Sequence, residues 1–106
     1  MRVLFDQGTP APLRRSLTEH QVETAHERGW STLRNGELSS AAEDEGFDVF
    51  VTTDSNLRYQ QNLGSRRIAI VVLSTTSWPR IRGATDRVVE AVARASPTLY
   101  VEVKIP

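Results

Sequence analysis

The sequence contains no cysteine among its 106 residues, which excludes disulfide bonds, thiolate metal sites, thiol nucleophiles and iron–sulfur clusters. It also lacks an excess of one charge. Thirteen basic and thirteen acidic residues give a net charge of zero, which excludes binding of nucleic acid through a globally basic surface. A local basic patch is compatible with this net charge. Long hydrophobic runs are missing as well. The longest covers residues 68–73, far short of the roughly 20 apolar residues that span a bilayer.

The composition indicates one globular domain, which we expect to cover residues 1–106. Hydrophobic residues make up 39% and charged residues 25%. This composition is ordinary for a folded soluble chain and is too apolar for a disordered one. No extended apolar segment follows Met1, so we expect no signal peptide, no membrane partner and a cytoplasmic location.

Strand-like and helix-like segments alternate along the chain. Apolar and β-branched runs predict strands at residues 3–5, 22–25, 47–53, 68–73 and 99–105. Helical spacing predicts helices between them, at 9–17, 37–45, 55–61 and 81–95, with Thr9 and Asn35 as N-caps, Gly46 as a C-cap and Gly83 as a weak point. This order predicts right-handed crossovers and a three-layer α/β/α sandwich with a mostly parallel five-stranded sheet.

Polar residues follow the predicted strands at the edge where such sheets bind ligands. Asp6 follows the first strand, Asp54 the third, and Asn56 lies two residues further on. Glu37 opens the helix before the third strand, so it faces the same edge. Crowded carboxylates repel one another, and a hard divalent cation such as Mg²⁺ or Mn²⁺ is the usual reason to tolerate them. This points to metal-assisted phosphoryl transfer or nuclease chemistry.

Each acid also has a purely structural interpretation. Asp6 suits a turn, Glu37 is stabilised by the dipole of the helix it opens, and Asp54 suits an N-cap. The specificity of the prediction comes from all three meeting at one sheet edge.

Two segments resemble the signatures of small bacterial PIN-like proteins. LFDQGTP at residues 4–10 is similar to their opening strand followed by Asp-Glu-Asn-x-Pro, and VTTDSNL at 51–57 to their Val-Thr-x-Asp-x-Asp-Phe signature. NGEL at 35–38 falls where they carry an Asp-Glu-Glu helix start. The resemblance covers nearly the whole chain and implies a PIN-like fold and a Mg²⁺- or Mn²⁺-dependent ribonuclease. It also implies a toxin–antitoxin pair like those of VapC toxins, with a cognate antitoxin and a homodimer as partners.

The resemblance matches Asp6, Glu37 and Asp54 to the family's metal-binding acids. Amides replace further acids of the family pattern, at Gln7, Asn35 and Asn56. Amide oxygens coordinate more weakly than carboxylates, so one cation, with Asn56 assisting, is more plausible than two.

Further residues at the same edge are candidates for binding RNA or orienting the acids: Thr52, Ser74, Thr75, Arg80 and Arg82. Trp30 and Trp78 are candidates to stack a base, although we expect Trp30 to cap the core instead.

Two other functions stay open. The amide substitutions favour a nuclease-like fold that serves as a binding module without turnover. The second is a phospho-acceptor receiver domain. Such domains carry an acceptor Asp after the third strand, a hydroxyl after the fourth and a Lys after the fifth. Asp54, Thr75 or Thr76, and Lys104 occupy the corresponding positions here. The receiver hypothesis is the weaker one, because receivers carry a pair of acids near the first strand and a helix after the Lys. Here Asp6 stands alone, and Lys104 is followed by Ile105 and Pro106.

Overall fold

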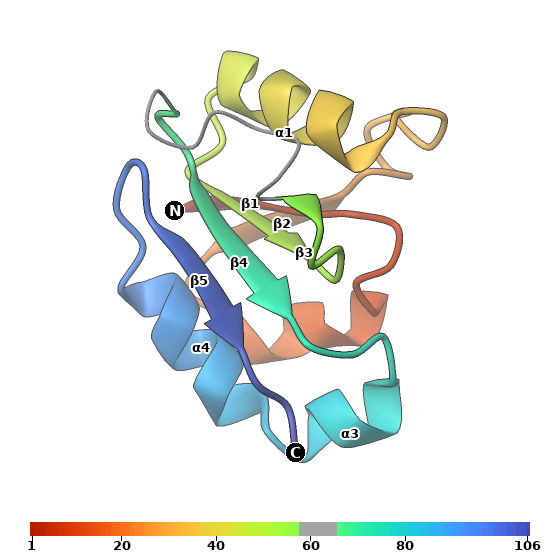
Figure 1. The fold of residues 1–106 in the computed structure, drawn as a ribbon, viewed down its shortest axis with the longest axis vertical. Coiled ribbons are helices and arrows are strands. Elements are labelled where there is room, and N and C mark those ends of the chain that lie inside the picture. Colours follow the sequence, from red (N-terminus) through yellow and green to blue (C-terminus); the bar gives the residue numbers. More distant parts are fainter. Residues whose placement is uncertain (58–65) are drawn as a thin grey trace.

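The computed structural model describes residues 1–57 and 66–106, which form five strands with helices on both sides (Figure 1). The elements in chain order are β1 (Arg2–Phe5), η1 (Ala11–Ser16), β2 (Gln21–Thr24), α1 (Asn35–Asp44), β3 (Val49–Thr52), β4 (Ala69–Leu73), α3 (Trp78–Arg82), α4 (Thr85–Ala93) and β5 (Tyr100–Val103). Most of the helix predicted over 55–61 lies outside the described residues. No helix in the described part of the chain is long and apolar enough to cross a membrane.

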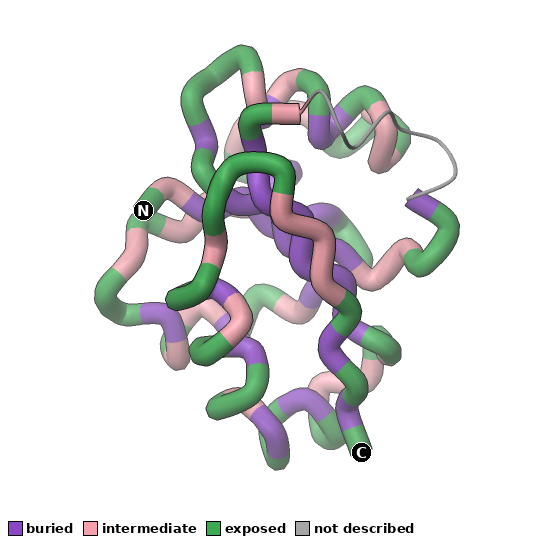
Figure 2. Tube along the Cα trace, turned by 60° about the vertical axis from the view of Figure 1, so that its left-hand side comes forward, coloured by how far each residue is buried: buried purple, intermediate pink, exposed green. Residues whose placement is uncertain are grey.

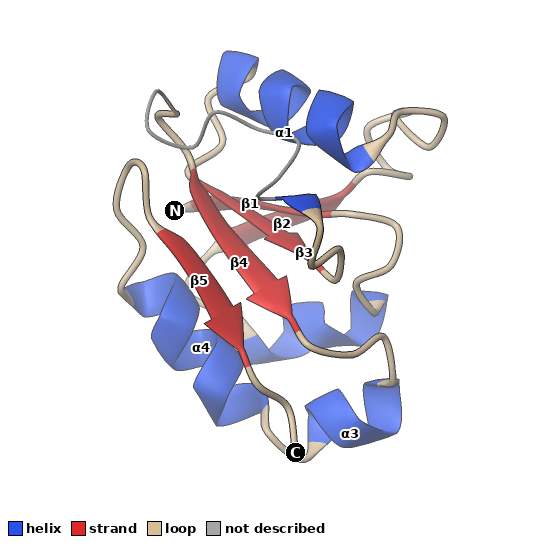
Figure 3. Cartoon of the chain, in the orientation of Figure 1, coloured by secondary structure: helices blue, strands red, loops and turns tan. Residues whose placement is uncertain are grey.

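The sheet confirms the predicted α/β class. Its order is β2-β1-β3-β4-β5, and every described pairing is parallel (Figure 3). All five carboxyl ends therefore lie at one edge. β4 is buried along its whole length, as its uninterrupted apolar run predicts.

Two cores form on the two faces of the sheet, because successive strand residues point to opposite sides. In β1, Val3 and Phe5 pack into one core and Leu4 into the other. The first core is covered by η1, α3 and α4, and the second by α1. The buried strands form the purple centre of Figure 2, inside a mostly exposed shell.

The crossovers do not share one hand. The chain moves from β1 to β2 in one direction with η1 on the first core, and from β2 to β3 in the opposite direction with α1 on the second core. These two connections have the same hand. The β4–β5 connection moves in the second direction but places α3 and α4 on the first core, so its hand is opposite. The expectation of right-handed crossovers throughout is wrong. The six-residue η1 shares the first core with α3 and α4, which places the β4–β5 connection on that face.

Several local predictions need correction. The first helix is a short 3₁₀ helix whose N-cap is Pro10 rather than Thr9. Helix α1 begins at Asn35, so its N-cap is Arg34. The predicted end of α1 at Gly46 is confirmed by the positive φ of that glycine, 80°. The helix predicted over 81–95 is instead two helices, α3 and α4, which are separated at Gly83, the predicted weak point.

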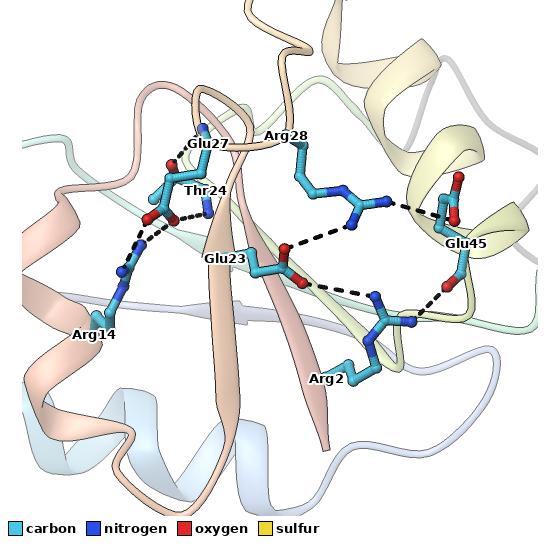
Figure 4. Close-up of polar contacts among 7 residues, drawn as sticks. All are labelled: Arg2, Arg14, Glu23, Thr24, Glu27, Arg28 and Glu45. Atoms are coloured by element: carbon cyan, nitrogen blue, oxygen red, sulfur yellow. Dashed lines mark hydrogen bonds and ion pairs between the residues drawn. The ribbon is translucent and has the colours of Figure 1, made fainter.

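Ion pairs hold the edge strand β2 to its neighbours (Figure 4). Glu23 lies 3.6 Å from the Arg2 guanidinium and 3.5 Å from that of Arg28, which also lies 3.4 Å from Glu45. The Arg2 guanidinium also sits 4.3 Å from the ring centroid of Phe47. This cluster covers the rim of the second core with cations stacked on an aromatic ring.

A second polar contact fixes the turn after β2 (Figure 4). Arg14 of η1 pairs with Glu27, and Glu27 accepts a 2.9 Å hydrogen bond from the backbone N–H of Thr24. The hydrogen bond from Arg14, followed by that from Thr24, holds the pKa of Glu27 below its ordinary value of 4.5.

We predict a pH-dependent loss of stability for Glu27→Gln. The carboxylate's contribution is complete above pH 4.5 and is lost as the pH falls through the lower folded-state pKa. Urea unfolding should therefore show the variant less stable than the wild type at neutral pH, with the gap closing as the pH falls below the lowered pKa of Glu27. Glu19→Gln, at an exposed turn, is the matched control. A gap that stays constant with pH contradicts the assignment.

Candidate functional site

The candidate site lies where the strand order reverses. From β1 the chain passes to β2 on one side, and β3 pairs on the other side of β1. In a parallel sheet this reversal leaves a crevice outside the carboxyl ends of the two central strands. Asp6 directly follows β1, and Asp54 lies two residues after β3 ends at Thr52.

Asp6 is almost completely buried, at 3% exposure, and its carboxylate is held by three donors. Its Oδ1 accepts hydrogen bonds from the backbone N–H of Thr9 at 2.9 Å and from the Thr9 hydroxyl at 2.6 Å. Its Oδ2 accepts one from the hydroxyl of Thr52 at 2.6 Å. These bonds compensate the lost hydration of the carboxylate and fix its orientation.

The Thr52 hydroxyl joins the two strand ends. While it donates to Asp6, its oxygen accepts a 3.0 Å hydrogen bond from the backbone N–H of Asp54. Asp54 Oδ1 accepts from the backbone N–H of Asn56 at 3.0 Å, and Oδ2 from the side-chain amide of Asn35 at 3.3 Å. The end of β3 is thus joined to the start of α1 through Asn35 and to the end of β1 through Thr52 and Asp6.

A cleft of about 530 Å³ opens at this point. It is lined by both acids, by the turn after β1 and by the start of α1: Asp6, Gln7, Gly8, Leu33, Arg34, Asn35, Thr53 and Asp54. Two carboxylates and one guanidinium give these walls a net charge of −1.

Glu37 is not among the residues that line the cleft. It is exposed, and its Oε1 accepts a 3.0 Å hydrogen bond from the backbone N–H of Arg34, the N-cap of α1. This is the helix-capping role that an acid at the third helical position performs. The structure therefore brings Asp6 and Asp54 together, while a metal-binding role for Glu37 stays a prediction.

Two of the amides act as donors, which carboxylates cannot do. The Gln7 side chain donates to the carbonyl oxygen of Ser31, tying the turn after β1 to the loop before α1. Asn35 donates to Asp54. An acid at either position would face an oxygen without a proton to share. Asn56 contacts Asp54 through its backbone N–H, which donates to Asp54 Oδ1.

The other predicted substrate residues have partners within the fold. The Ser74 hydroxyl accepts from the backbone N–H of Ile105 at 2.8 Å, and that of Thr75 accepts from Ser77 at 3.1 Å. The Arg80 guanidinium donates to the carbonyl oxygens of Ile105 and Pro106, at 2.9 and 3.0 Å. These contacts anchor the segment after β5.

Arg82 is exposed at the end of α3, and Thr52 is fully buried between the acids. Of the two roles expected for it, Thr52 is thus placed to orient the acids rather than to touch a substrate. Trp30 packs beside Phe47 at the second core, with 6.4 Å between ring centroids, as expected of a core cap.

Sequence reasoning missed Gly8 and Arg34 as cleft residues. A Cβ on Gly8 would collide with the Thr53 hydroxyl oxygen, so a larger residue at this position would force the Thr53 side chain to move. A glycine two residues after a strand-terminal Asp was the available signal. For Arg34 the signal was only its place beside the helix start.

Within residues 1–57 and 66–106, no three His, Cys, Asp or Glu side chains are arranged to hold a metal ion. Comparison of the chain with models of protein families, with curated proteins and with solved structures finds no match. The likeness to PIN-like proteins therefore rests on the segments around Asp6, Glu37 and Asp54.

We predict that Thr52→Val destabilises the protein by about 1–3 kcal/mol, because it leaves the buried Asp6 carboxylate short of a donor at nearly unchanged volume. Chemical denaturation measures the difference. Thr52→Ser keeps the hydroxyl and should cost only about 1 kcal/mol for the lost methyl group. If Thr52→Val is as stable as the wild type, the hydroxyl does not hold the strand ends as described.

Proposed function

We propose that this chain is a PIN-like ribonuclease that hydrolyses phosphodiester bonds with the help of one Mg²⁺ or Mn²⁺ ion. One observation carries the proposal: Asp6 and Asp54 line a single cleft at the switch point of the sheet, joined through the Thr52 hydroxyl. Those acids stand in the two segments that resemble the family signatures.

The donor set suits one cation better than two. Each carboxylate oxygen accepts about two hydrogen bonds. Asp6 Oδ1 already accepts two, which leaves one acceptor position on Oδ2, and each oxygen of Asp54 has one more. The amide nitrogen of Asn35 makes the hydrogen bond to Asp54, which leaves the side-chain carbonyl oxygen of Asn35 as a further ligand for a cation. Mg²⁺ typically keeps several waters beside one or two carboxylates, so these groups fit it.

A divalent cation held there would neutralise phosphate charge and lower the pKa of a water. The chain's own residues supply the rest. Thr52 and Thr9 hold the Asp6 carboxylate in place, and Asn35 orients that of Asp54. Arg34, exposed at the cleft wall, is positioned to pair with a phosphate oxygen.

The resemblance extends the proposal to partners. A ribonuclease of this kind would act as the toxin of a toxin–antitoxin pair in the cytoplasm, with a cognate antitoxin protein and a homodimeric form. These assignments rest on the family likeness alone.

We predict that Asp6→Asn and Asp54→Asn each abolish Mn²⁺-dependent cleavage of single-stranded RNA and the thermal stabilisation that Mn²⁺ gives the wild type. Fluorescence-labelled RNA and thermal unfolding with and without Mn²⁺ measure the two effects. Glu37→Gln tests the predicted metal-binding role of Glu37, because glutamine can still accept the bond from Arg34: lost cleavage supports that role, and retained cleavage leaves Glu37 with helix capping alone.

Asp44→Asn is the control, since it removes the same charge from an exposed position at the far end of α1. A wild type that neither cleaves RNA nor gains stability from Mn²⁺ contradicts the proposal.

The amide contacts favour a second candidate, a binding module without turnover. With Gln7 donating to Ser31 and Asn35 to Asp54, the cleft is held together without a cation. The receiver reading shares the observed strand order, which doubly wound sheets of several functions use. A stable acyl-phosphate on Asp54 would support it, and RNA cleavage lost in Asp6→Asn would contradict both alternatives.

A further inference from the structure

A second hollow of about 470 Å³ adjoins the cleft across the turn after β1. The two share Asp6, Gln7 and Gly8. The far side of the second hollow is built from the end of β2 and the loop between β4 and α3: Thr24, Ala25, His26, Thr76 and Trp78. The size falls in the range of small-molecule sites.

Trp78 forms an aromatic wall of this hollow and is held in a defined position. It is the first residue of α3, half-buried, and packs against the first core. The Ser77 hydroxyl caps the helix by accepting from the backbone N–H of Arg80, and Ser77 in turn donates its backbone N–H to Thr75. An indole fixed in this way is a stacking surface that loses little entropy on binding.

The chemistry of the walls favours an uncharged, flat group. Among the lining residues, Asp6 is the one acid, and its buried carboxylate accepts hydrogen bonds from Thr9 and Thr52; Lys and Arg are absent from this set. His26 and Thr76, both exposed, offer an imidazole and a hydroxyl for edge contacts. No Lys or Arg of this hollow could pair with a phosphate, whereas Arg34 of the neighbouring cleft could.

We propose that the Trp78 hollow binds the nucleobase next to the phosphodiester that is cleaved, with the base stacked on the indole and the phosphate in the Asp6–Asp54 cleft. This rests on the proposed ribonuclease function and defines its substrate as single-stranded RNA. A base can stack on a protein ring only when it is released from a duplex.

The test follows the indole N–H signals of the two tryptophans in a ¹⁵N–¹H spectrum during titration with adenosine 5′-monophosphate in EDTA. We expect the Trp78 signal to shift saturably while the Trp30 signal stays, since Trp30 packs at the second core. In variants without the Trp78 indole, the backbone amide signal of Gly8, which lines the hollow, reports binding: Trp78→Ala should weaken it by about tenfold, and Trp78→Phe should retain most of it. His26→Ala, at an exposed position, tests the site without touching the core and should also weaken binding.

Binding in EDTA and cleavage in Mn²⁺ separate the two proposals. Cleavage without a Trp78 shift, or unchanged affinity in both Trp78→Ala and His26→Ala, overturns the base pocket alone. A saturable Trp78 shift without cleavage by the wild type upholds the pocket and overturns the ribonuclease.

Discussion

The hydroxyl of Thr52 connects the two acids on which the functional interpretation depends. It donates to the buried carboxylate of Asp6 and accepts from the backbone of Asp54, so the ends of β1 and β3 cannot shift independently. Gly8 adds a steric constraint, because any side chain there would collide with Thr53. Three hydrogen bonds orient the carboxylate of Asp6 and two orient that of Asp54, so both are positioned without a ligand.

The amides around this cleft give it less negative charge than acids at the same positions would, and two of them donate hydrogen bonds that join its walls. Asn35 and Gln7 donate hydrogen bonds where acids would repel neighbouring oxygens. The walls carry two carboxylates and Arg34, and in the proposed function this charge suits one hydrated cation better than two. The same arrangement would suit a substrate phosphate approaching Arg34.

Much of the architecture could be predicted because it follows from local periodicity and strand direction. The apolar run around β4 predicts burial on both faces, and parallel strands bring Asp6 and Asp54 to one edge. The hand of the β4–β5 connection could not be predicted, because local periodicity does not show which of the two cores α3 and α4 pack against. The position of Glu37 depends on a single backbone contact, its hydrogen bond to Arg34, which a residue pattern does not distinguish from a metal-facing orientation.

The most direct test of a cation site between Asp6 and Asp54 is paramagnetic broadening of backbone amide signals by substoichiometric Mn²⁺. The account predicts that the signals of Gly8 and Asp54 broaden first, while those around the exposed Asp44 persist. Equal broadening around Asp44, or sharp signals at Gly8 and Asp54 throughout the titration, would contradict it.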